Sequence, residues 1–200
     1  KIMANKNQPT IIFIFGGSGD LTYRKLMPAL YNLYLDNYLP EKFLIVAIGR
    51  TEYTNDAFRD HSKKGIEEHS RRKDAVETKW KEFAPAVEYF QADLENDAAY
   101  NEMLERVRKA EKDWNTKATI VFYLSVAPQL APTIAEKLHK AKLTADCKRT
   151  RMVFEKPFGH DLQSAMELND KGGEMGKEEQ IYRIDHYLGK ETVQNILALR

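Results

Sequence analysis

Short apolar runs alternate with longer amphipathic stretches along most of the chain. The runs are rich in β-branched and aromatic residues, and most lack the strict polar alternation of a half-exposed strand. We therefore predict buried strands over 11–15, 43–48, 87–91, 119–124, 151–154 and 181–184. The amphipathic stretches predict helices over 22–37, 55–69, 70–83, 97–113, 130–142 and 161–171, with a further helix from about 187 to the chain end.

Six strands that alternate with helices indicate an α/β fold. Near-continuous apolar strands are typical of a parallel sheet, because the crossover helices cover both of its faces. We predict a doubly wound, mostly parallel sheet with right-handed crossovers, a Rossmann-like dinucleotide-binding domain over residues 11–185. Residues 1–10 are polar and are expected to form a flexible N-terminal arm.

Local signals refine two of the predicted helices. Pro28 lies inside the first helical stretch, where its ring and its missing N–H disfavour a regular helix. We therefore expect an irregular first turn, with regular helix starting near Met27. Thr54 or Asn55 is expected to cap the second helix.

A glycine-rich turn follows the first predicted strand directly. Gly16, Gly17 and Gly19 stand between that strand and a helical stretch, an arrangement typical of nucleotide-binding folds. Glycine lets the backbone approach a ligand closely, and the N–H groups at the helix start suit a pyrophosphate. The match to the G-x-G-x-x-G fingerprint is incomplete, because Thr22 stands where a third small residue is usual. A tight turn without a ligand is the alternative.

The end of the second predicted strand bears on the choice of coenzyme. In a dinucleotide fold this position lies beside the adenosine ribose, where an acidic residue binds the 2′-hydroxyl of NAD. Here Arg50 follows the strand, and its guanidinium suits a 2′-phosphate, which favours NADP and leaves NAD possible. Glu52 is the nearest acid and would weaken this preference. The alternative interpretation of Arg50 is an ordinary surface arginine.

Two later motifs carry candidate chemistry for a substrate. The first, EKPFG over 155–159, follows a strand at the sheet edge where open α/β folds bind ligands. Lys156 is its candidate residue, placed to contact a sugar hydroxyl or the coenzyme. A strand-ending loop with a solvated lysine is the alternative.

The second motif is RIDHYLGKE over 183–191. If a helix begins near Tyr187, His186 and Lys190 lie one turn apart on one side of it. Their donors and the Tyr187 hydroxyl suit a dianionic phosphate, and Asp185 is placed to orient His186. The alternative is a helix cap with a surface pair of histidine and lysine.

Charge and composition exclude several classes of protein. A net charge of +1 argues against nucleic acid as a partner, and the Arg71–Lys73 run is balanced by neighbouring acids, as on a solvated helix face. The longest apolar run, 43–48, is too short for a bilayer, and the first ten residues lack the apolar core of a signal peptide. Cys147 is the single cysteine, which suits a reducing compartment. We expect a cytoplasmic protein with no membrane partner and no metal site.

Four segments together are similar to the glucose-6-phosphate dehydrogenase family. They are GGSGDLTYRKLMPALYNL, FYLSVAP, EKPFG and RIDHYLGKE, and they occur in this order across almost the whole chain. The resemblance implies oxidation of C1 of glucose 6-phosphate to the lactone, with hydride transfer to NADP, or to NAD in some members. That reaction is the entry to the pentose phosphate pathway.

The resemblance also implies roles for individual residues. The coenzyme diphosphate is expected on Gly16, Gly17, Ser18, Gly19, Asp20 and Leu21, and the 2′-phosphate on Arg50, while Tyr123 and Ser125 line the coenzyme site. Lys156 is expected to touch both coenzyme and sugar, and His186, Tyr187 and Lys190 to bind the sugar phosphate. Asp185 and Lys25 are expected in supporting places near the reacting groups.

Members of this family are more than twice as long as this chain. The resemblance therefore implies a fragment in which 186–200 starts the substrate-domain helix, with the general-base histidine and the oligomer interface expected beyond Arg200. Such a chain is expected to bind coenzyme and to be inactive alone. His186 as the base is less favoured, because a phosphate-binding histidine is held protonated. The competing interpretations of the whole chain are a different NAD(P)-dependent sugar oxidoreductase and a non-catalytic NADP-binding module.

Overall fold

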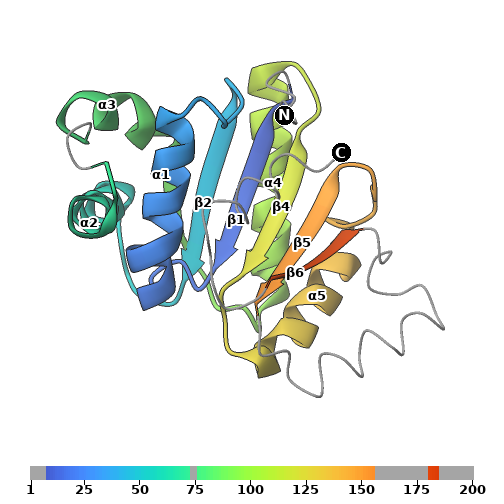
Figure 1. The fold of residues 1–200 in the computed structure, drawn as a ribbon. Helices are drawn as coiled ribbons and strands as arrows, with labels where there is room; N and C mark the ends of the chain where they lie inside the picture. The colour runs from blue at the N-terminus through green and yellow to red at the C-terminus, as the bar shows by residue number, and fades with distance from the viewer. Residues whose placement is uncertain (1–7, 73–75, 156–179, 185–200) are drawn as a thin grey trace.

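The computed structural model describes residues 8–72, 76–155 and 180–184, and a six-stranded parallel sheet forms its centre (Figure 1). The strand order is β3-β2-β1-β4-β5-β6, so the order reverses direction between β1 and β4. This is the doubly wound arrangement that the sequence predicts. The strands are β1 (Thr10–Phe15), β2 (Phe43–Gly49), β3 (Val87–Gln91), β4 (Thr119–Leu124), β5 (Thr150–Glu155) and β6 (Ile181–Ile184).

Helices cover both faces of the sheet. On one face lie α1 (Met27–Leu35), α2 (Asn55–His69) and α3 (Val76–Phe83), and on the other lie α4 (Asp97–Trp114) and α5 (Ala131–Lys140). Figure 1 shows the first three gathered beside β1 and β2. Short 3-10 turns, η3 (Ala84–Ala86) and η4 (Pro128–Leu130), complete the connections.

Two apolar layers hold these helices on the sheet. Because successive strand residues point to opposite faces, Phe13 of β1 packs in the α4–α5 layer while Ile12 and Ile14 pack in the α1–α3 layer. All six residues of β1 are buried, as expected for a central parallel strand with helices on both faces.

The first helical stretch is irregular at its start, as predicted. Residues Thr22–Leu26 form a single-turn π-helix, η1, and regular helix begins at Met27 with Pro28 in its first turn. Proline is tolerated there because the first N–H groups of a helix have no intrahelical partner. Single-turn π-helices are often found at functional sites.

Most predicted elements are confirmed, and several differ at their ends. The strands over 87–91, 119–124 and 181–184 and the helix over 55–69 have the predicted bounds. The first helical stretch ends at Leu35 and α5 at Lys140, two residues before the prediction in each case. Predicted helices over 161–171 and from 187 lie outside the described residues.

The prediction of a helix over 70–83 is wrong at its start. Ser70 has an extended backbone, and its hydroxyl donates to Asn32 Oδ1 at 2.8 Å, so α2 ends at His69. Arg71 and Arg72 follow outside any helix, and Arg72 Nη1 lies 2.6 Å from Asp36 Oδ1. These arginines are therefore not on a helix face.

In the described part of the chain, no helix combines the length and the apolar character needed to cross a membrane. Within the same residues, no group of three or more histidine, cysteine, aspartate or glutamate side chains is arranged to hold a metal ion.

Candidate functional site

The ends of four neighbouring strands bring the candidate residues to one edge of the sheet. In the parallel register, Phe15 of β1 is level with Ile48 of β2 and with Leu124 of β4, and Leu124 is level with Phe154 of β5. The glycine turn, Arg50 and Ser125 therefore follow side by side at the carboxyl edge. Ligands of open α/β sheets bind at this edge, where the strand order reverses.

Gly16 is held in a conformation that other residues rarely adopt. Its φ is +79°, and a Cβ placed on it would lie 2.0 Å from the carbonyl oxygen of Ser125. The Ser125 N–H in turn donates to the carbonyl of Phe15 at 3.0 Å. The turn after β1 and the exit loop of β4 are therefore locked together, and only glycine fits at the contact.

Gly17 and Gly19 have different roles in the same turn. Gly17 is buried against β2: its N–H donates to Ile48 O at 2.7 Å, and a Cβ would lie 2.6 Å from that of Ala47. Gly19 is exposed, its N–H donates to Gly16 O at 2.9 Å, and a Cβ there would meet only that oxygen, at 3.1 Å. Gly17 thus seats the turn on the sheet, while Gly19 lies on its open side.

The open side of the turn carries unpaired backbone donors. The helix that follows begins at Asp20, and the first helical bond runs from the N–H of Tyr23 to the carbonyl of Gly19. Among the described residues, the N–H groups of Ser18, Asp20 and Leu21 have no intramolecular hydrogen-bond partner. Unpaired N–H groups at a helix start, with the positive end of the helix dipole, favour an anion such as a diphosphate.

Thr22, the departure from the fingerprint, fits the turn without disturbing it. Its side chain is buried, and its hydroxyl donates to the carbonyl of Gly16 at 3.0 Å. The threonine therefore adds a hydrogen bond that fixes Gly16, where a smaller residue would leave none. An irregular π-helical turn starts at this residue.

The residues that follow β2 form a compact polar cluster with Ser18. Thr51 Oγ1 donates to Ser18 Oγ at 3.1 Å, and Tyr89 Oη donates to Thr51 O at 2.7 Å. A Cβ on Gly49 would lie 2.7 Å from both Ser18 Oγ and Tyr89 Oη, so glycine is required for this approach. Arg50, which is exposed, stands between Gly49 and Thr51 in the chain. The backbone of Arg50 is thereby held between ordered neighbours, and its side chain is open to solvent.

Tyr123 and Glu155 form a pair at the ends of β4 and β5. The Tyr123 hydroxyl donates to Glu155 Oε1. Burial, and after it the contact with Glu155, raise the pKa of the Tyr123 phenol above its ordinary value, so it remains a donor at neutral pH. The pair joins Tyr123, which is predicted to line the coenzyme site, to the first residue of the EKPFG motif.

The structure brings some predicted residues together and leaves others untested. Ser125 meets Gly16 directly, while Asp20 and Lys25 are exposed, Asp20 lying 3.8 Å from Arg24. Leu21 packs at the edge of the α1–α3 layer. Lys156, Asp185, His186, Tyr187 and Lys190 lie outside the described residues, so their roles remain predictions.

Sequence reasoning missed three side chains at this edge. Thr51 and Tyr89 complete the cluster around Ser18, and Glu155 accepts from Tyr123. Thr51 could have been found, because it directly follows Arg50. Tyr89 could not, because its contribution depends on the register between β2 and β3, which places it opposite Ala47.

Comparisons with known proteins match this geometry. The family model described as "Glucose-6-phosphate dehydrogenase, NAD binding domain" matches residues 13–195. A glucose-6-phosphate 1-dehydrogenase of Chlamydia pneumoniae is 39% identical over 197 residues, which cover 96% of this chain and 38% of that protein. One from Bacillus subtilis is 37% identical over 196 residues, covering 98% of this chain and 39% of that protein.

Solved structures agree with the sequence relatives. A structure described as glucose-6-phosphate dehydrogenase in complex with its substrate glucose-6-phosphate superposes with a TM-score of 0.78 at 34% identity, covering 97% of this chain and 40% of that one. The enzyme from Mycobacterium avium gives 0.72 at 30% identity, covering 90% and 36%. The chain thus spans about two-fifths of the length of the relatives it matches. It belongs to the glucose-6-phosphate dehydrogenase family, as a Rossmann-type domain of the kind that binds a nicotinamide dinucleotide.

Proposed function

We propose that this chain forms the coenzyme-binding part of an NADP-dependent glucose-6-phosphate dehydrogenase, which oxidises C1 of the sugar to the lactone at the entry to the pentose phosphate pathway. The observation that carries the proposal is that the glycine turn, Arg50 and the end of β5 all lie at the same edge of the sheet. Relatives named for this activity match the chain over almost its whole length and support the substrate.

The residues of the turn fit the diphosphate of a dinucleotide. Ser18, Asp20 and Leu21 offer N–H donors without partners among the described residues, and Gly19 leaves that side of the turn free of any Cβ. Tyr123 and the loop at Ser125 are proposed to line the rest of the coenzyme path. When bound, the coenzyme supplies the nicotinamide ring that accepts the hydride.

Arg50 supports NADP as the preferred coenzyme. It lies at the end of β2 beside the Ser18–Thr51 hydroxyl pair, in which Thr51 donates to Ser18, so a guanidinium and the Ser18 hydroxyl can both donate to phosphate oxygens. No carboxylate bonds to this hydroxyl pair in the part of the chain that is described, whereas NAD sites place one near the ribose.

We propose that the sugar is held by residues of the two later motifs. Lys156 contacts coenzyme and sugar, while His186, Tyr187 and Lys190 bind the phosphate, because a partly desolvated dianion needs compensating cations. Asp185 orients His186, and Lys25 lies near the reacting groups. The base that takes the C1 hydroxyl proton is proposed to be a histidine in the part of the relatives' length beyond Arg200.

Two further properties complete the proposal. The half-buried lone Cys147 supports a reducing, cytoplasmic location. The longer protein is proposed to form a homo-oligomer through the part that lies outside this chain, which the family resemblance supports.

The coenzyme part of the proposal is tested by calorimetric titration of NADP and NAD into Arg50→Ala. A hydrogen bond to a charged group is worth about 1.5–3 kcal/mol, so NADP affinity is expected to fall about 10- to 100-fold. NAD affinity should hardly change, since NAD has no 2′-phosphate. Arg50→Lys is the matched control, because it keeps the charge without the planar fork and should lose less. Equal losses for both coenzymes would show that Arg50 acts on the fold or the diphosphate.

A further inference from the structure

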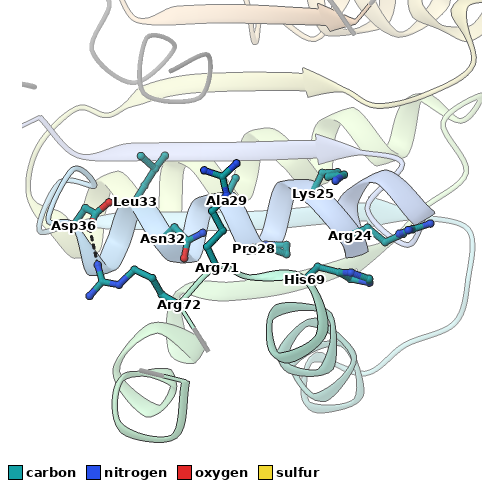
Figure 2. Close-up of a pocket in the computed structure, with 10 residues that line it drawn as sticks. All are labelled: Arg24, Lys25, Pro28, Ala29, Asn32, Leu33, Asp36, His69, Arg71 and Arg72. Carbon is teal, nitrogen blue, oxygen red and sulfur yellow. Dashed lines mark hydrogen bonds and ion pairs between the residues drawn. The ribbon is translucent and has the colours of Figure 1, made fainter. Parts of the chain in front are cut away.

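A cationic groove runs along the outer face of α1, apart from the glycine turn. It is a cavity of about 220 Å³ between α1 and the segment that leaves α2 (Figure 2). Its ten lining residues are Arg24, Lys25, Pro28, Ala29, Asn32, Leu33, Asp36, His69, Arg71 and Arg72. The groove exists because α2 stops at His69, which turns the next residues across α1 instead of continuing a helix.

The charge in this groove is strongly one-sided. Four of the lining side chains are permanently cationic and one is a carboxylate, so the lining carries a net charge of +3 with His69 neutral. The carboxylate, Asp36, is already held by Arg72 at 2.6 Å. Arg24 faces Asp20 at 3.8 Å, and His69 faces Glu68 at 3.5 Å, but neither of these acids lines the groove.

Two of the cations have no partner in the described part of the chain. Neither Lys25 nor Arg71 forms an ion pair or hydrogen bond with another described residue. Figure 2 shows Arg71 extending across α1 toward Ala29, so its guanidinium lies over the groove. Cations that line one groove repel one another, and an anion bound beside Arg71 relieves that repulsion.

The floor of the groove is partly apolar and also carries a neutral amide, and both features favour a bound anion. Pro28 and Leu33 are buried, so water is excluded from one side, and charges interact more strongly where water is excluded. Asn32 lies on the same floor with its Oδ1 fixed by the Ser70 hydroxyl at 2.8 Å. Its Nδ2 group therefore remains as a neutral donor among the cations.

We propose that this groove is a binding site for a small phosphate-bearing molecule. Guanidinium groups match phosphate oxygens with paired donors, and a phosphate monoester carries about −1.5 to −2 charge at neutral pH, which suits a lining of this sign. Drug-sized ligand pockets measure about 300–1,000 Å³, so a cavity below that range selects a compact ligand. The groove lies apart from the glycine turn. It shares only Lys25 with the proposed function, so the inference rests on Arg71 and Asn32 and does not depend on the coenzyme assignment.

The test is an NMR titration of the 200-residue chain with inorganic pyrophosphate and, separately, with glycerol 3-phosphate. The side-chain amide of Asn32 is the reporter, because it lies inside the groove. We expect saturable shifts of this signal at millimolar ligand. The ligand that binds more tightly shows whether the groove prefers an inorganic phosphate or a phosphate ester. Shifts confined to the backbone amides of Ser18 and Asp20 would place the anion on the glycine turn and overturn the proposal.

Two arginine variants complete the test. Arg71→Ala should weaken binding about tenfold, the loss expected for one hydrogen bond to a charged ligand. Arg108→Ala is the matched control, since Arg108 is an exposed helix arginine, 63% exposed and paired with Glu105, on the opposite face of the sheet. A loss of the same size in both variants would show non-specific charge attraction and overturn the site. An Asn32 signal that never responds would equally refute it.

Discussion

The three glycines of the turn after β1 look alike in the sequence, but the structure predicts three different responses to alanine. At Gly16 a Cβ would lie 2.0 Å from Ser125 O, and φ is +79°. At Gly17 the nearest atoms are Ala47 Cβ at 2.6 Å and Ile48 N at 2.7 Å. At Gly19 the one close atom is Gly16 O, at 3.1 Å.

The magnitudes follow from these contacts. An L-residue in the left-handed region costs about 1–2 kcal/mol, and overpacking a fixed neighbour costs about 1–3 kcal/mol. Gly16→Ala incurs both and should lose about 2–5 kcal/mol of unfolding free energy, while Gly17→Ala incurs the second alone. Gly19→Ala meets only a slight contact, which the reduced entropy of the unfolded chain, worth about 0.4–1 kcal/mol, should offset.

Urea denaturation followed by far-UV circular dichroism measures the series, with NADP titration on each folded variant. We expect the stability order Gly19→Ala, then Gly17→Ala, then Gly16→Ala, with Gly19→Ala close to the parent chain. Coenzyme affinity should fall in Gly19→Ala despite its normal stability, because Gly19 lies on the side of the unpaired N–H donors. Equal midpoints for Gly16→Ala and Gly19→Ala would refute the role of the Ser125 contact.

Two further predictions concern acid stability and the sugar phosphate. Burial opposes ionisation of Glu111, but hydrogen bonds from Lys117, Ala118 and Arg149 outweigh it and lower the pKa of Glu111 below its ordinary value of 4.5. Its stabilisation is present above that value and is lost as pH falls through the lower folded-state pKa, so the urea midpoint should fall as the pH drops below 4.5, and less steeply in Glu111→Gln. In a protein extended to the length of the relatives, Lys190→Ala should raise KM for glucose 6-phosphate and leave KM for free glucose almost unchanged, because free glucose has no dianion to bind. A parallel rise for both sugars would place Lys190 outside the phosphate site.

Local pattern in the sequence determined most of the architecture. The apolar runs identify the strands because a parallel strand must be apolar on both faces, and this property is visible within about five or six residues. Thr54 was one of two predicted caps of α2, and its hydroxyl accepts from Ala57 N at 3.1 Å. The other candidate, Asn55, instead accepts from the N–H of Tyr89 at 2.7 Å, which no local signal indicates.

The family resemblance supplied the assignment of function, which hydrophobic periodicity alone does not contain. Composition and spacing point to a nucleotide fold with a cationic strand end, and the order of four motifs narrows this to one family. The match over 13–195 confirms that assignment. The roles of Lys156, His186 and Lys190 rest on the motifs alone, because these residues lie outside the described part of the chain.

Tertiary contacts decided the features that the sequence did not determine. The helix predicted over 70–83 begins late because Ser70 bonds to Asn32, a residue 38 positions earlier. That same contact turns Arg71 and Arg72 across α1 and creates the cationic groove. Thr22 fits the turn because its hydroxyl finds the carbonyl of Gly16, and Tyr89 reaches Thr51 because of the β2–β3 register. Helix and strand periods are set by neighbours a few residues apart, whereas these contacts join residues brought together only when the chain has folded.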